Sequence, residues 1–109
     1  MIKINKRNFI RDELLKLNYS PRYLGTLYLT EVIDFISKQE NYIEYLKSME
    51  RTSYTVIADR FNVNVETLKS DIRKACIKAS KVKTRGRKAV KSFAPKNITC
   101  YVLEKIPKI

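Results

Sequence analysis

The side chains with the clearest chemical use are polar or basic and run from Asn64 to Lys91. Arginine and lysine donate hydrogen bonds to guanine O6 and N7, glutamate accepts one from cytosine N4, and serine can do either. One predicted helical face, which also includes Val65, holds the side chains that could read base edges in this way: Asn64, Glu66, Lys69, Ser70, Arg73 and Lys74. The cations that follow show no pattern of base readout, and we expect them to contact phosphates: Lys78, Lys81, Lys83, Arg85, Arg87, Lys88 and Lys91.

The charge of the chain is concentrated in the same region. The 109 residues include 23 Lys and Arg, 11 Asp and Glu and no histidine, so the formal net charge is +12. Residues 1–68 hold ten basic and nine acidic side chains, whereas residues 69–109 hold thirteen basic and two acidic ones. This asymmetry indicates a polyanionic partner, nucleic acid before an anionic membrane, with a basic surface kept for solubility as the alternative.

The composition does not favour catalysis. General acid and base chemistry near neutral pH mostly uses histidine, and the chain has none. Gly25 and Gly86 stand alone, so they form no phosphate-cradling loop. Tyrosines that could act as nucleophiles occur at helical spacings among Leu and Ile, which favours a role in the core: Tyr19, Tyr23, Tyr28, Tyr42 and Tyr45. We therefore predict no enzyme activity, no cofactor, no metal site and no small-molecule substrate.

Other features of the composition predict a single cytoplasmic domain over residues 1–109 that binds no membrane. No apolar run reaches the roughly 18 residues that cross a bilayer. The N-terminal residues MIKINKRN lack the apolar core of a secretory signal. Cys76 and Cys100 form neither a disulfide framework nor, without histidine, a zinc site. We interpret both as reduced, mostly buried thiols.

Apolar spacing predicts three helices before residue 54. The first covers residues 9–17, and the third covers residues 42–49 and ends where Arg51–Ser53 break the pattern. The second is predicted to begin at Ser20–Pro21, with serine as the cap and proline in the first helical position, and to reach about Lys38. Its inward residues are predicted to be Leu24, Leu27, Tyr28, Val32 (or Leu29), Phe35 and Ile36. Gly25 is expected to mark a close helix crossing or a frayed first turn.

Residues 54–80 fit a helix-turn-helix, in which a small residue lies where two short helices meet and the turn needs left-handed geometry. Ser53 is predicted to cap the first helix, with Ile57, the small Ala58 and Phe61 facing inward. Asn62 takes the turn position, because asparagine tolerates a positive φ. Val63 fills the turn, Asn64 caps the second helix, and the second helix faces the core with Leu68, Ile72 and Cys76. Residues 64–74 would then read the major groove.

Residues 14–79 resemble the C-terminal DNA-binding domain of the sporulation stage-zero master response regulator of endospore-forming bacteria. The matching blocks are residues 24–29, LGTLYL, followed by Glu31; residues 57–62, IADRFN; and Leu68, Ile72, Arg73 and Ala75. Residues 95–97, PKN, with Val102 and residues 104–106, EKI, resemble the last helix of that family. The resemblance implies an all-helical domain of about six helices that binds DNA through the fourth and fifth, often as two copies on neighbouring sites.

The chain departs from this family in two respects. Family members are normally joined to a phosphoacceptor receiver domain, for which 109 residues leave no room. Their recognition helix presents a Glu-Arg pair and an Arg-His pair, where this chain has Lys69-Ser70 and Arg73-Lys74. Only Arg73 carries over unchanged, so neither the DNA sequence that the family reads nor its role in sporulation follows.

The segment after residue 80 allows two folds. Residues 81–94 are predicted to be a basic loop that contacts phosphates or enters a minor groove. Ile98–Leu103 is rich in β-branched and aromatic residues, which favours a strand and would make residues 84–103 the β-hairpin wing of a winged helix-turn-helix. The resemblance instead implies a final helix, and we adopt the all-α alternative.

Together these features predict a protein that binds specific double-stranded DNA as a homodimer or as tandem copies and acts as a transcriptional regulator. The same binding could serve an accessory role in plasmid or phage DNA processing, such as conjugation or replication. An RNA-binding module is a further alternative, which a helix-turn-helix disfavours because the major groove of RNA is too narrow for a helix. Binding of a membrane or an acidic protein through residues 78–91 is disfavoured because that stretch lacks an apolar face.

Overall fold

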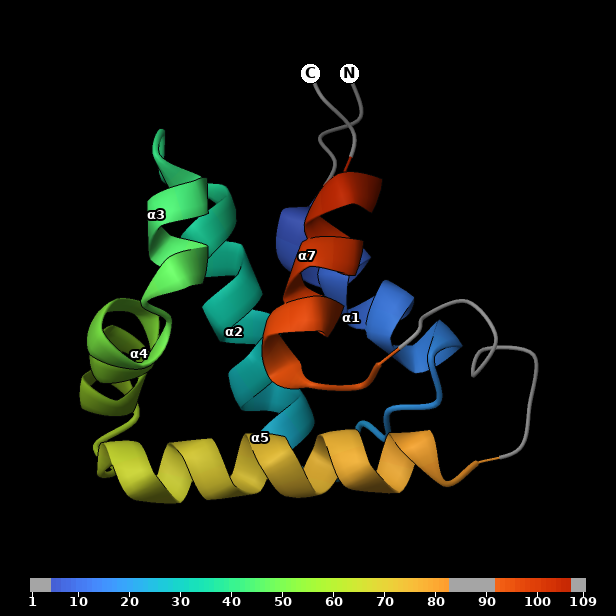
Figure 1. Ribbon diagram of the computed structural model, residues 1–109. Coiled ribbons are helices and arrows are strands. Elements are labelled where there is room, and N and C mark those ends of the chain that lie inside the picture. The colour runs from blue at the N-terminus through green and yellow to red at the C-terminus, as the bar shows by residue number, and fades with distance from the viewer. Residues whose placement is uncertain (1–4, 83–91, 107–109) are drawn as a thin grey trace.

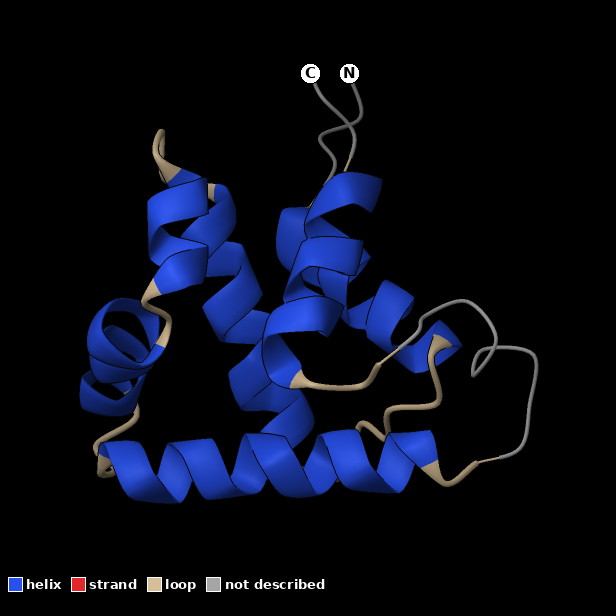
Figure 2. Cartoon of the chain, viewed as in Figure 1, coloured by secondary structure: helices blue, strands red, loops and turns tan. Residues whose placement is uncertain are grey.

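The computed structural model describes residues 5–82 and 92–106, and these residues are helical apart from their connections (Figures 1 and 2). The α-helices are α1 (Lys6–Lys16), α2 (Leu24–Ser37), α3 (Tyr42–Lys47), α4 (Thr55–Arg60), α5 (Val65–Ser80) and α7 (Pro95–Lys105). A single π-helical turn, η1 (Glu50–Tyr54), leads directly into α4. The described residues contain no β-strand. The predicted all-α fold with about six helices is therefore confirmed.

Helix α2 lies at the centre of the core and packs mainly against α1 and α5. Its apolar residues Leu29, Val32, Ile33 and Ile36 are completely buried. The residues that meet them from the surrounding helices are also completely buried, namely Ile10 and Leu14 of α1, Leu68 and Ile72 of α5, and Ile98 and Val102 of α7. These pairs recur at a spacing of four residues, which places both members on the same face of a helix.

Helices α2 and α5 cross in direct contact at Gly25. A Cβ atom on Gly25 would overlap the carbonyl oxygen of Asp71 and would lie 2.8 Å from the Cβ of Ala75. Gly25 has no side chain, and α5 meets it with a backbone carbonyl and a methyl group, so α5 lies against the backbone of the first turn of α2. Of the two alternatives for Gly25, a close helix crossing or a frayed first turn, the crossing is confirmed.

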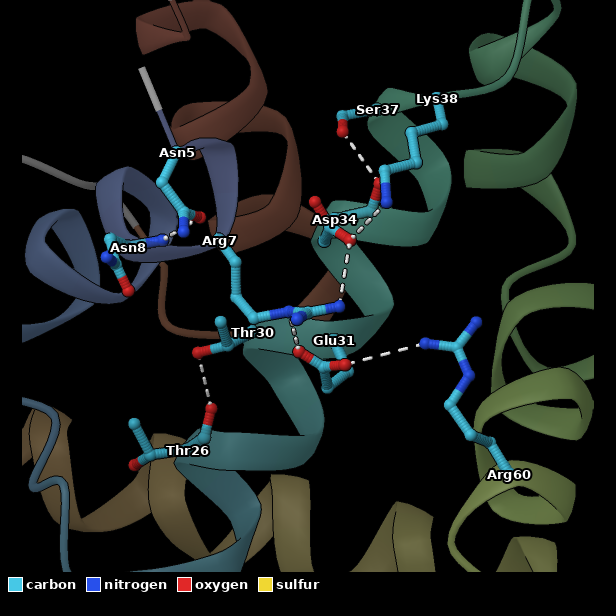
Figure 3. A network of polar contacts seen from close by, with 10 residues as sticks. All are labelled: Asn5, Arg7, Asn8, Thr26, Thr30, Glu31, Asp34, Ser37, Lys38 and Arg60. Atoms are coloured by element: carbon cyan, nitrogen blue, oxygen red, sulfur yellow. Dashed lines mark hydrogen bonds and ion pairs between the residues drawn. The ribbon is translucent and has the colours of Figure 1, made fainter. Parts of the chain in front are cut away.

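Two buried carboxylates on α2 join three helices (Figure 3). Glu31 and Asp34 have side chains only 7% and 4% exposed. Arg7 of α1 lies with Nε 2.6 Å from Glu31 Oε2, and Arg60 of α4 lies with Nη1 3.4 Å from Glu31 Oε1. Asp34 Oδ2 lies 3.0 Å from Lys38 Nζ and 3.7 Å from Arg7 Nη2. Buried charges require such partners, so these ion pairs specify how α1 and α4 are oriented on α2.

The predicted start of the second helix at Ser20–Pro21 is wrong. Ser20 instead forms a turn, in which its Oγ accepts a hydrogen bond from Arg22 N at 3.2 Å, and Tyr23 is extended with φ −91° and ψ 134°. The helix begins at Leu24, because an extended Tyr23 directs the chain into the crossing at Gly25. Leu24 and Leu27 were expected to face inward but are 57% and 44% exposed.

The predicted break at residues 51–53 is also wrong. Backbone N–H groups continue to find partners through this stretch, as Tyr54 N donates to Met49 O at 2.8 Å. Because the chain is already helical in η1 before α4 begins, no side chain caps α4. Ser53 is completely buried and caps no helix. Thr55 Oγ1 donates to Glu50 O at 3.1 Å and joins the π-helical turn to α4.

The final helix is confirmed, and the β-hairpin wing is wrong for the described part of residues 84–103. Pro95 occupies the first helical turn, where its missing N–H removes no hydrogen bond. Ile98 and Val102 then share a buried face, and Thr99 Oγ1 donates to Pro95 O at 2.7 Å. Burial at helical spacing here prevails over the strand propensity of the β-branched residues. Residues 84–91 lie outside the described residues.

The predicted core tyrosines divide into two groups. Tyr19 and Tyr28 are buried and Tyr45 is half-buried, whereas Tyr23 and Tyr42 are 39% and 45% exposed, so the prediction is wrong for the last two. The Tyr19 hydroxyl donates to Cys76 Sγ at 2.9 Å. Both cysteines are free thiols, with Cys76 buried and Cys100 half-buried. Burial raises the pKa of Cys76 to about 11, against the smaller opposite effect of the hydrogen bond from Tyr19.

The crossing predicts that Gly25→Ala destabilises the protein. The added Cβ meets a backbone carbonyl that cannot rotate away, and overpacking of this kind costs about 1–3 kcal/mol. Urea denaturation measures the free energy of unfolding. Leu24→Ala, at the adjacent exposed position, is the control and should change that energy by less than about 0.5 kcal/mol. An equally stable Gly25→Ala protein would contradict the close crossing.

The burial of Cys76 predicts that the two thiols react at very different rates. The thiolate is the reactive form, and a rise in pKa from 9.0 to about 11 lowers its fraction at neutral pH by about a hundredfold. We expect a thiol reagent to label Cys100 in the folded protein and to reach Cys76 only in denaturant. The Cys100→Ser variant should then show no labelling before unfolding, and rapid labelling of that variant would contradict the packing behind α5.

Candidate nucleic-acid interface

Helices α4 and α5 are joined by a tight turn over residues 61–64. Ile57 and Ala58 of α4 are buried. The rings of Phe61 and of Tyr28 in α2 pack edge to face, with their centroids 5.4 Å apart. Asn62 has a positive φ of 55°, and Val63 N donates to Ala58 O at 3.0 Å. The predicted inward residues and the left-handed turn at Asn62 are confirmed. That α4 and α5 act as a DNA-binding helix-turn-helix stays a prediction.

Helix α5 begins at a side-chain cap. Asn64 is extended, with φ −82° and ψ 160°, and its Oδ1 accepts a hydrogen bond from Thr67 N at 2.7 Å. The prediction that Asn64 caps the helix is confirmed. This hydrogen bond fixes the orientation of the Asn64 amide, which restricts the paired contact that asparagine can make with adenine.

The long sides of α5 differ in character. Leu68, Ile72 and Cys76 face the core as predicted, together with Ala75 and Ala79. Figure 1 shows α5 along the bottom of the molecule, with the other helices above it. The side chains exposed on the opposite side are Glu66, Thr67, Ser70, Arg73, Lys74, Ile77 and Lys78. This face offers donors, acceptors and cations along a helix of 16 residues.

Most of the predicted base-reading residues share this exposed face. Asn64, Glu66, Ser70, Arg73 and Lys74 are exposed. Lys69 is less free than expected, because its side chain is only 29% exposed and its Nζ lies 2.8 Å from Glu50 Oε1 of η1. Val65 was expected to point outward but is half-buried and packs against the core. Both residues lie toward η1 and α4, where the short turn keeps those elements close to α5.

The predicted phosphate contacts are only partly described. Lys78 and Lys81 are exposed, and Lys78 Nζ lies 4.1 Å from the centre of the Tyr23 ring. A cation over an aromatic face is held in place without losing its charge. The remaining residues of this set lie outside the described residues, as does most of the predicted basic loop: Lys83, Arg85, Arg87, Lys88 and Lys91.

Sequence reasoning missed two residues of the exposed face and several neighbouring cations. Thr67 is exposed and Ile77 is 46% exposed, and the helical period that identified Ser70 and Arg73 would have identified both. Arg51 and Lys96 lie in a hollow beside Arg73. They come from η1 and α7, so no spacing in the sequence could have indicated that they lie near α5.

The titratable side chains buried between α5 and the core, Tyr19, Tyr54 and Cys76, are neutral at physiological pH. Burial raises the pKa of Tyr54 well above its ordinary value, while the positive charge of Arg73 acts in the opposite direction. Burial likewise raises the pKa of Tyr19, beside Cys76. In the described part of the chain, no three Cys, Asp or Glu side chains gather as a metal site requires. This arrangement can donate and accept hydrogen bonds and attract anions.

Within residues 5–82 and 92–106, none of the helices combines the length and the apolar composition of a bilayer span.

The turn predicts opposite outcomes for two substitutions at Asn62. Asn62→Ala places a residue with no local hydrogen bond in left-handed geometry and should lower the free energy of unfolding by about 1 kcal/mol. Asn62→Gly adopts that geometry freely and should leave the stability within about 0.5 kcal/mol. Thermal or urea unfolding compares the two variants. If alanine proved as stable as glycine, the left-handed turn between α4 and α5 would be disproved.

No protein-family model matches the chain, and no curated protein matches it. The resemblance to sporulation regulators therefore stays a prediction. Among the residues that carry it, Gly25 lies at the crossing of α2 and α5, Asn62 lies in the turn, and Arg73 lies on the exposed face of α5.

Proposed function

We propose that this protein binds specific double-stranded DNA by placing α5 in the major groove. The observation that carries the proposal is the exposed face of α5, on which Glu66, Ser70, Arg73 and Lys74 stand free while the opposite face anchors the helix in the core. An α-helix with its side chains is about 10–12 Å wide, and the major groove is about 12 Å wide. Because α5 lies at the edge of the molecule, its exposed side can enter a groove (Figure 1).

The chemistry of this face supports reading of bases as well as binding of phosphates. Arg73 makes no ion pair with a described residue, so its guanidinium is available to guanine O6 and N7. Glu66 could accept from cytosine N4, and Ser70 could pair with either kind of edge. Lys78 and Lys81 continue the face with positive charge. The resemblance of residues 14–79 to a family of DNA-binding domains, which stays a prediction, agrees with this proposal.

A role in transcription and an accessory role in plasmid or phage DNA processing use the same interface. In either role the protein binds as a homodimer or as tandem copies, and the spacing of half-sites in selected DNA distinguishes the two arrangements. Selection of bound sequences from a random duplex library supplies the preferred site. RNA duplexes, whose major groove excludes a helix, should compete weakly with that site.

The central prediction concerns Arg73→Ala and Lys81→Ala. Removal of a base contact should weaken binding to the selected site by about 1–3 kcal/mol and should reduce the preference for that site over random DNA. Removal of a phosphate contact at Lys81 should weaken binding to both DNAs alike. Fluorescence anisotropy titrations on the two duplexes measure these effects.

Two outcomes of these titrations would contradict the proposal. If Arg73→Ala and Lys81→Ala behaved alike, α5 would not read bases through this face. Affinity should also fall about 10³–10⁵-fold between 50 and 200 mM salt, as expected for six to ten phosphate contacts. Binding that did not depend on salt would mean that the basic residues do not meet the phosphate backbone.

A further inference from the structure

A basic hollow lies along one flank of α5, between η1 and the start of α7. Its volume is about 570 Å³. The charged side chains that line it are Lys47, Arg51, Lys69, Arg73, Lys96 and the single acidic residue Glu50. Glu50 pairs with Lys69, whereas Arg51, Arg73 and Lys96 make no ion pair with any described residue. The hollow therefore has an unbalanced positive charge that an anion could neutralise.

Two uncharged features of this hollow also suit an anion. Tyr54 lines it, and its phenol hydroxyl can donate a hydrogen bond. Helix α7 begins at its rim, with Pro95 in the first turn and no side-chain cap on its N-terminus. The positive end of the α7 dipole adds to the field of the lining cations.

A second, smaller basic hollow lies along the other flank of α5. Its volume is about 210 Å³, and its lining includes Arg22, Lys74 and Lys78 with Asp71 as the acidic residue. The Tyr23 ring beneath Lys78 holds the ammonium group beside this hollow. Arg22 belongs to the turn that precedes α2, and the crossing at Gly25 brings that turn against α5.

The two hollows are separated by the exposed face of α5. Residues advance by about 100° each around a helix, which places Lys69 and Arg73 on one flank and Lys74 and Lys78 on the other, with Ser70 between them. The major groove is about as wide as an α-helix with its side chains. A helix that fills the groove therefore has one phosphate backbone on each side. The two hollows thus lie on opposite sides of the exposed face of α5, as the two backbones lie on opposite sides of a helix in the groove.

We propose that each hollow holds backbone phosphates of a different DNA strand. Arg51 and Lys96 bind the strand on the side of η1 and α7, and Arg22 and Lys78 bind the strand on the other side. This inference rests on the proposed function, since it requires α5 to lie in the groove. It assigns DNA contacts to Arg22, Arg51 and Lys96, which lie outside the helix-turn-helix and outside the basic loop.

Charge-neutralising variants test this assignment. We expect Arg51→Gln and Arg22→Gln each to reduce the slope of log K against log salt by about 0.9 for each phosphate that the variant no longer neutralises, which is about an eightfold weaker affinity at 0.1 M salt. The reduction should be equal on the selected and the random duplex. In the double variant the slope should fall by about twice as much. Lys105→Gln is the matched control, because it removes the same charge at the end of α7 far from α5 (Figure 1).

Ethylation interference on the selected duplex then locates the contacts. Arg51→Gln should remove interference at phosphates of one strand, and Arg22→Gln should remove it at phosphates of the other strand across the same groove. Removal on a single strand by both variants, or slopes like that of Lys105→Gln, would overturn the inference. If both variants gave slopes like that of Lys105→Gln while Arg73→Ala still reduced the preference for the selected site, the inference alone would fail. A wild-type protein that bound no duplex DNA would overturn both proposals.

Discussion

The contact between Gly25 and α5 is the constraint on which the rest of the structure depends. Without a side chain at this position, the carbonyl of Asp71 and the Cβ of Ala75 lie against the backbone of α2. This close approach lets Leu68 and Ile72 reach the core while the other side of α5 stays in solvent. It also brings the turn that carries Arg22 beside α5. The absence of a side chain at Gly25 therefore permits the close packing of α5 that buries one side of this helix and exposes the other.

The buried carboxylates extend this arrangement to the other helices. Glu31 forms ion pairs with Arg7 of α1 and Arg60 of α4. Through Arg60, α4 is joined directly to α2. A helix of six residues has little stability alone, and tertiary contacts must hold it. The ion pair between Arg60 and Glu31 orients the helix that leads into the Asn62 turn, and the Asn64 cap then begins α5.

Local signals in the sequence predicted the parts of the fold that local physics decides. Asn62 and Asn64 were identified because left-handed turns and helix caps need particular side chains, and Leu68, Ile72 and Cys76 were identified by their period. A close crossing at Gly25 was among the expectations, but prediction failed at other places where the fold depends on distant contacts. The start of α2 was misplaced because it is set by the crossing with α5, and Ser53 was assigned as a cap because nothing indicated a π-helical turn. Arg51 and Lys96 were missed because chain topology alone brings them to α5.

The most direct measurement of the central claim is the ¹⁵N NMR spectrum of the labelled protein during titration with a selected DNA duplex. The account predicts that the largest shifts occur at Ser70, Arg73 and Lys74 on the exposed face of α5, with small shifts at the exposed Tyr42 and Ile43 of α3, on another side of the molecule. Shifts centred on α3 with α5 unaffected, or no shifts at all, would contradict the claim that α5 is the surface that meets DNA.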